Sequence, residues 1–179
     1  ISDQTGIASP VLQYYLGQLS RALGLVEKRT PVCGNRMAPQ YVLRDNFFKF
    51  WYNFVAKNST ALEINNYKLV RDRISAEIEG MTGFAFEEVI RELIAKHNNG
   101  KLGEMPINVA QLGGWWDRKG NEIDICGQSK GALLLGEVRW RAKPVDYADA
   151  AKFFEKRYLI DCTNEQRRNI VLFVVSKSG

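Results

Sequence analysis

Apolar residues near the start of the chain recur every three or four positions. Over residues 9–23 this spacing is typical of an amphipathic helix, and Ser9 would cap its first turn. Short apolar segments at 25–29 and 40–43 flank a turn region with glycine and asparagine, and they predict a β hairpin. A helix followed at once by a two-stranded hairpin is the outline of a winged helix.

The next segment is rich in aromatic residues. Residues 47–55 carry apolar side chains at most positions, and Asp45 would cap the helix that they predict. Apolar groups on most of its faces indicate a helix buried between two parts of the protein. Two further helices are expected, one over 68–80 that ends at Gly80 and one over 82–97.

Beyond Pro106 the spacing of the apolar residues changes from helical to alternating. A helix is predicted at 145–159. Strands are predicted at residues 107–112, 122–126, 132–140 and 170–175. Strands interleaved with helices indicate an α/β fold, here preceded by a helical module.

The two middle strands of this region carry acidic residues. A tight turn between them would place Asp124 opposite Glu137. Strict alternation would also put Glu122, Asp124 and Cys126 on one face, with Glu137 and Arg139 sharing a face of the next strand. Opposed carboxylates lie about 5 Å apart at Cβ and repel one another unless a cation lies between them. A register slip of one residue would separate the pair.

A third acid lies on the preceding helix. Glu87 borders the apolar stripe formed with Ile90 and Ile94, so it would face the sheet. Three inward-facing acids would form a site for a hard cation such as Mg²⁺, which prefers carboxylate oxygens. The alternative is a surface salt bridge in which Arg139 neutralises Glu137, and the spacing by itself leaves both open.

The net charge is +5, and the excess of lysine and arginine lies toward the two ends of the chain. This charge permits nucleic-acid binding without requiring it. Four basic residues would lie on the recognition helix and wing of the winged helix, where they would contact DNA phosphates: Arg21, Lys28, Arg29 and Arg36. The alternative is a solvated face on a module that only connects domains.

Composition excludes several kinds of chemistry. His97 is the single histidine, which argues against histidine-based catalysis, and Cys33, Cys126 and Cys162 lack the paired spacing of a zinc site. They fit reduced thiols in a cytoplasmic protein. No P-loop pattern occurs, so no ATP site is expected within the chain, and no apolar run has the length of a membrane helix. Trp115 and Trp116 are expected in the core, and the alternative is that they stack on bases.

Three blocks of the chain carry a family resemblance: Gly83–Glu87, Gly114–Ile125 and Gly136–Trp140. They resemble the C-terminal region of archaeal-type AAA+ ATPases, a domain of unknown function that is similar to PD-(D/E)xK nucleases. Residues 14–32 resemble the winged helix of that family, and residues 41–51 resemble the aromatic segment that follows it. Because the chain begins at Ile1, we interpret it as a fragment whose winged helix starts upstream.

The resemblance implies a fold and its boundaries. A restriction-endonuclease-like mixed sheet flanked by helices would occupy residues 81–179. It would be preceded by a partial winged helix at 1–45 and a helical linker at 46–80. ATP hydrolysis would belong to the upstream AAA+ domain.

The resemblance also implies site residues. Asp124 and Glu137 would bind Mg²⁺ or Mn²⁺, with the Val138 carbonyl as a third ligand, and Glu87 would be the helical acid near the metal. Arg139 occupies the position where the nucleases usually have a lysine, and an arginine is bulkier, planar and permanently protonated. Other lysines would then supply the amine: Lys143, or Lys152 with Lys156.

The resemblance implies metal-dependent phosphodiester hydrolysis, with DNA and the upstream ATPase as partners. The alternative is a catalytically inactive module that binds DNA or protein and regulates the ATPase. A third hypothesis is a structural or oligomerising tail that makes its contacts through the aromatic helix.

Overall fold

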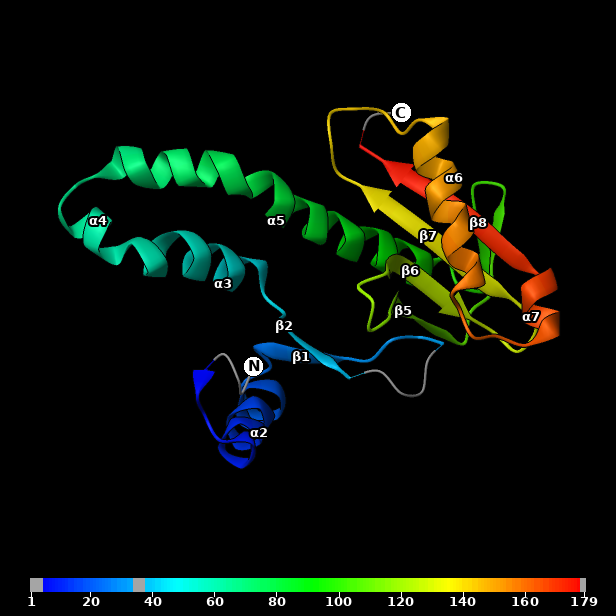
Figure 1. Ribbon diagram of the computed structural model, residues 1–179, viewed down its shortest axis with the longest axis horizontal. Coiled ribbons are helices and arrows are strands. Elements are labelled where there is room, and N and C mark those ends of the chain that lie inside the picture. Colours follow the sequence, from blue (N-terminus) through cyan, green and yellow to red (C-terminus); the bar gives the residue numbers. More distant parts are fainter. Residues whose placement is uncertain (1–4, 34–37, 178–179) are drawn as a thin grey trace. The chain divides into compact units, whose positions relative to one another are not determined.

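The computed structural model describes residues 5–33 and 38–177 (Figure 1). The chain forms two compact units: unit 1 comprises Ile1–Arg29 with Pro39–Val70, and unit 2 comprises Thr30–Ala38 with Arg71–Gly179. The fold mixes helices with antiparallel and parallel strand pairs, as the sequence predicts. The units do not coincide with the expected segments, and the assignment of functions to those segments stays a prediction.

Unit 1 begins with a helix and a hairpin. The helix comprises α2 (Ser9–Gly17) and the π-helical turn η1 (Gln18–Ala22). Strand β1 (Val26–Arg29) pairs antiparallel with β2 (Gln40–Leu43), which confirms the predicted hairpin. The helix begins at Ser9, as the pattern predicts, but its N-cap is Ala8 rather than Ser9.

The aromatic segment is helical, and Asp45 caps it as predicted, since its Oδ1 accepts a hydrogen bond from Phe48 N at 2.9 Å. The segment comprises α3 (Asn46–Phe50), η2 (Trp51–Val55), η3 (Ala56–Asn58) and α4 (Ser59–Glu63). The expected burial on most faces is wrong. Phe54 is buried with Phe50 against it, whereas four aromatic side chains are 42–68% exposed: Phe47, Phe48, Trp51 and Tyr52. Only one stripe of the helix therefore packs inward.

Helix α5 (Tyr67–Lys96) is continuous over 30 residues. The predicted end at Gly80 is wrong, because a single glycine weakens a helix by only about 1 kcal/mol and no proline interrupts the hydrogen bonds. The helix ends before Asn99, whose φ of 65° is left-handed, as the Asn-Asn-Gly sequence predicts. Within the described part of the chain, no helix is both long and apolar enough to cross a membrane.

Unit 2 contains a four-stranded mixed sheet. Its order is β5 (Gln111–Trp116), β6 (Glu122–Gln128), β7 (Leu133–Arg139) and β8 (Ile170–Ser176). The first three strands are antiparallel, and β8 runs parallel to β7. The crossover between β7 and β8 contains α6 (Tyr147–Glu155), the turn η4 (Lys156–Tyr158) and α7 (Asn164–Arg168). A small hairpin, β3 (Gly100–Leu102) with β4 (Met105–Ile107), and α7 were not predicted.

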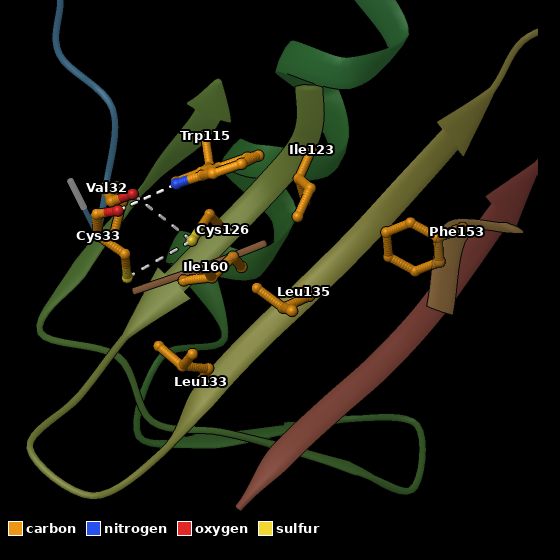
Figure 2. Close-up of a cluster of buried hydrophobic side chains, with 9 residues drawn as sticks. All are labelled: Val32, Cys33, Trp115, Ile123, Cys126, Leu133, Leu135, Phe153 and Ile160. Carbon is orange, nitrogen blue, oxygen red and sulfur yellow. Dashed lines mark hydrogen bonds between the residues drawn. The ribbon is translucent and has the colours of Figure 1, made fainter. Parts of the chain in front are cut away.

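Helices cover both faces of this sheet, so each face has its own core. On one face, Phe153 of α6 packs with Ile123, Cys126 and Leu135, and Trp115 is buried there as predicted (Figure 2). On the other face, residues of α5 pack on the sheet: Ile90 and Ile94 lie against Ile125, Leu134 and Val138. Glu137 is buried between these layers, whereas Asp124 is half-buried.

The register between β6 and β7 is the predicted one. Ile125 lies opposite Gly136 and Gln128 lies opposite Leu133, so continuation of this register brings Asp124 to Glu137. The turn forms with Ser129 N donating to Ala132 O at 3.0 Å. The short apolar pattern and its glycine-containing turn were therefore sufficient to predict the pairing.

The predicted alternation in β6 is wrong at Ile123. A register shift between β5 and β6 pairs Gly113 with Cys126 but Trp115 with Ile123, so one residue is extra on β6. Such a bulge interrupts the alternation. Ile123 and Cys126 consequently share one core and Ile125 belongs to the other, so Ile123 and Ile125 do not share the face that strict alternation gives them.

Gln166 provides a test of the packing beneath α7. It is 3% exposed, its Oε1 accepts from Thr163 N at 3.0 Å, and its Nε2 donates to Ser129 O at 2.7 Å. We expect Gln166→Ala to lower the free energy of unfolding by about 2 kcal/mol, because two backbone groups lose their partner. Urea denaturation measures this loss, and the exposed neighbour Glu165→Gln serves as control. Equal stability of the two variants would contradict the role given to Gln166.

Candidate functional site

Glu137 is a buried acid near the end of β7. It is 3% exposed, and two cations contact its carboxylate. Lys156 Nζ, from η4, donates to Oε2 at 3.1 Å, and the guanidinium of Arg139 forms an ion pair with Oε1. Glu137 and Arg139 therefore share a face of β7, as the alternation predicts.

Asp124 lies beside this group because the register of β6 and β7 brings it to Glu137. Its Oδ2 accepts a hydrogen bond from Val138 N at 2.8 Å. This bond lies just beyond Ile125 and Gly136, the last paired residues of β6 and β7 at this end. The Asp124 side chain is thus the acceptor for a backbone N–H of β7. The position of the carboxylate is fixed by the strand that carries Glu137, so the two acids are held together.

The direction of the Val138 carbonyl follows from the same bond. In an antiparallel pair a hydrogen-bonded residue directs both its N–H and its C=O toward the neighbouring strand. Because Val138 N donates to Asp124, its carbonyl oxygen also faces the β6 side of β7. Three hard oxygen donors consequently come from one place in the fold: the carboxylates of Asp124 and Glu137 and the Val138 carbonyl.

Burial raises the pKa of Glu137 above its ordinary value of 4.5, and the negative charge of Asp124 raises it further. Lys156 and Arg139 oppose this shift. Their side chains are 27% and 43% exposed, so water screens part of their charge. The charged form of Glu137 is thus less favourable here than in water, and added positive charge would stabilise it.

The raised pKa predicts how stability changes with pH. The folded protein binds the Glu137 proton more tightly than the unfolded chain, so this group stabilises the fold fully below pH 4.5. That contribution is lost as the pH rises through the raised pKa. Glu137→Gln has no carboxyl group at this position, so we expect its unfolding free energy not to fall as the pH rises from 4.5 through the raised pKa. The difference in unfolding free energy between this variant and the parent protein should therefore change over that pH range. Chemical denaturation at a series of pH values measures it, and parallel pH profiles would contradict the shift.

Lys156 is the amine that the structure places at the acids. Besides Glu137, its Nζ donates to Glu122 O at 2.8 Å, so it links β6 to β7. Lys143 instead pairs with Asp146 at 3.1 Å, and Lys152 is exposed. Among these three lysines, Lys156 is therefore the one that contacts Glu137.

Arg91 is a neighbour of the site that the sequence did not identify. Its Nη2 donates to Asp124 O at 3.2 Å, and the side chain is half-buried. No sequence pattern specifies such a partner.

The expected grouping of Glu87 with the two strand acids stays a prediction. Over residues 5–33 and 38–177, no three histidine, cysteine or acidic side chains gather in a group that could hold a metal ion. Glu87 is half-buried on α5, and its catalytic role stays a prediction.

Three of the four basic residues expected to bind DNA lie in unit 1: Arg21, Lys28 and Arg29. Arg21 and Lys28 are exposed, on η1 and β1. Arg29 forms an ion pair with Glu27 at 3.0 Å, which neutralises part of its charge. Arg36 lies outside the described residues. The structure does not test whether any of them contacts a phosphate.

One family model matches the chain over residues 51–153, which is more than half its length. The family is DUF234, described as archaea bacterial proteins of unknown function. The chain belongs to the DUF234 family. The DUF234 match contains Glu87 and the acidic strand ends with Arg139, whereas Lys156 lies three residues beyond it. No curated protein and no solved structure matches the chain. Family membership thus leaves the activity to be argued from the site.

Proposed function

We propose that unit 2 is a metal-dependent, nuclease-like domain that hydrolyses phosphodiesters in DNA. The observation that carries the proposal is the buried Glu137 between Lys156 and Arg139, with Asp124 held at the next strand. A carboxylate pair with an amine at adjacent strand ends is the chemical set that the PD-(D/E)xK resemblance implies. On this proposal, the sheet is of the restriction-endonuclease type.

The donor set suits a hard divalent cation. Asp124 and Glu137 offer carboxylate oxygens and Val138 a carbonyl, and Mg²⁺ is bound in proteins through one or two carboxylates with several waters. The pKa of Glu137, raised by burial and by Asp124, indicates that further positive charge is favourable there. Mg²⁺ or Mn²⁺ would be held by these three residues, and when bound it would polarise a phosphate and lower the pKa of a water.

The residues around the acids have distinct roles in the proposal. Lys156 Nζ orients Glu137 and holds β6 to β7, and it carries protons with which to position a water beside the carboxylate. Arg139 has a side chain that is 43% exposed, so its guanidinium is within reach of solvent and could contact a phosphate through two hydrogen bonds. The arginine thus binds the substrate, and the lysine of η4 supplies the amine.

We further propose that this chain is the C-terminal part of an AAA+ ATPase and that the α2 helix with the β1–β2 hairpin is a partial winged helix. The order of a helix and an antiparallel hairpin supports this assignment. Four basic residues would then bind DNA phosphates: Arg21, Lys28, Arg29 and Arg36. The ATPase would lie upstream and oligomerisation would follow from it.

The test is nicking of supercoiled plasmid and of single-stranded DNA by the full chain. We expect products with Mg²⁺ or Mn²⁺ and none with a chelator, because the acids need the cation to act on a phosphate. Glu122 is an exposed acid on β6, the strand that carries Asp124, and Glu122→Gln should retain the activity. Absence of metal-dependent products on both substrates would contradict the proposal.

A non-catalytic module that binds DNA or protein and regulates the ATPase is the second candidate. Both oxygens of Glu137 contact cations of the chain itself, which is the arrangement of a structural ion pair. Calorimetric titration with Mn²⁺ separates the two. Carboxylate-dependent metal binding favours the nuclease, whereas DNA binding without metal binding favours the regulatory module.

A further inference from the structure

Two cysteines that are far apart in the sequence lie in contact. Cys33 Sγ and Cys126 Sγ are 3.8 Å apart although 93 residues separate them along the chain (Figure 2). Both are free thiols and both are buried, and Cys126 is fully enclosed on β6. The sequence indicated scattered cysteines, so this pair arises only from the fold.

Two hydrogen bonds attach the backbone of Val32 and Cys33 to strand β5. Val32 N donates to Gly114 O at 2.9 Å, and the indole of Trp115 donates to Cys33 O at 3.0 Å. These bonds hold Cys33 at a φ of 60°, a left-handed conformation that residues other than glycine rarely adopt. The thiol therefore points at Cys126 because the flanking bonds hold the backbone in a strained conformation.

The two thiols differ in their access to solvent, because Cys126 is fully buried. A hydrogen bond from the Cys126 thiol lowers the pKa of Cys33. Cys33, which is 8% exposed, is therefore the sulfur that reacts first with a small oxidant from solution.

We propose that Cys33 and Cys126 form a reversible intramolecular disulfide when the protein meets a peroxide. The Cys33 thiolate attacks one peroxide oxygen, so the O–O bond breaks, a sulfenic acid forms and hydroxide leaves to become water. Cys126 Sγ then attacks the Cys33 sulfur, the S–S bond forms, the S–O bond breaks, and the hydroxyl leaves with the Cys126 proton as a second water. Two thiols are oxidised by two electrons in total, and the peroxide is reduced.

The step needs little movement. The sulfur atoms must close from 3.8 Å to about 2 Å, a change within reach of side-chain rotation. The bond would tie the segment that follows β1 covalently to β6, two residues from Asp124. The proposal does not depend on nuclease activity, since it concerns only the two thiols and the segment they join.

The experiment counts thiols in the full chain after denaturation, before and after treatment with hydrogen peroxide. The reduced chain has three cysteines, so we expect the count to fall from three to one in a monomer and to return to three with dithiothreitol. Non-reducing peptide mapping should recover Cys33 joined to Cys126. In Cys162→Ser the count should fall from two to zero.

Single variants and alternative products make the test decisive. Cys33→Ser should keep both remaining thiols at a peroxide dose that oxidises the parent protein, with circular dichroism confirming its fold. Cys162→Ser leaves Cys33 and Cys126 unchanged, so its result is valid even if Cys33→Ser fails to fold. An unchanged thiol count, a bond to Cys162 or a disulfide only between chains would each overturn the proposal.

Discussion

Asp124→Ala and Glu137→Ala are each expected to lower metal-dependent DNA nicking about 100-fold or more. Each change removes one of the two carboxylates that would hold the cation, and loss of one charge-stabilising group at a reacting centre reduces rates by about 10²–10³. Asp124 also loses its bond to Val138 N, so the strand end is affected as well. Initial nicking rates with Mg²⁺ and with Mn²⁺ measure the effect.

A matched set of variants separates chemistry from folding. Glu137→Gln keeps the shape of the side chain and its capacity to accept from Lys156, so its loss of activity would report the carboxylate charge. Glu122→Gln changes an exposed acid on β6 and should act like the parent protein. Circular dichroism establishes that each variant is folded. Nicking that survives both alanine changes in folded protein would rule out this acid pair as the metal site.

Gly136→Ala is expected to lower the free energy of unfolding by about 3 kcal/mol, since overpacking of a filled core forces neighbours from their positions. A Cβ at this position would lie 2.2 Å from Cζ of Phe173 and 2.6 Å from Cε1 and Cε2 of the same ring. Phe173, on the neighbouring β8, packs against the core that α5 covers, so the ring has little room to move. Guanidinium denaturation measures the loss.

Two further variants serve as controls for the effect of Gly136→Ala. Gly80 lies exposed in α5 with no atom within 4 Å of an added Cβ, so Gly80→Ala should stabilise the protein by about 0.5–1 kcal/mol. In the Phe173→Leu background the effect of Gly136→Ala should shrink, because the smaller side chain vacates the overlapping space. Additive effects in that double-mutant cycle would show that the ring is not the cause.

Local pattern was a reliable guide wherever neighbouring residues decide the structure. The Asp45 cap, the β1–β2 hairpin and the pairing of β6 with β7 all followed from residues close in sequence. Capping, alternation and tight turns depend on a few adjacent residues, so their energetics are visible without the rest of the chain. The juxtaposition of Asp124 and Glu137 could be predicted for this reason.

Patterns misled where weak local signals competed with stronger interactions. Gly80 suggested an end to a helix that continues through it, and the aromatic run after Asp45 suggested burial that only one stripe achieves. The bulge at Asp124 could not be predicted, because an extra residue in one strand becomes apparent only against the register of its neighbour β5.

The sequence by itself determined the mixed α/β class, the acidic strand pair and the shared face of Glu137 and Arg139, since each depends on spacing within one short segment. Only the tertiary structure decided which amine reaches the acids and which cysteines meet. Lys156 reaches Glu137 across 19 residues, and Cys33 reaches Cys126 across 93. Contacts over such separations are set by how helices and strands pack into common cores, and no local periodicity encodes that packing.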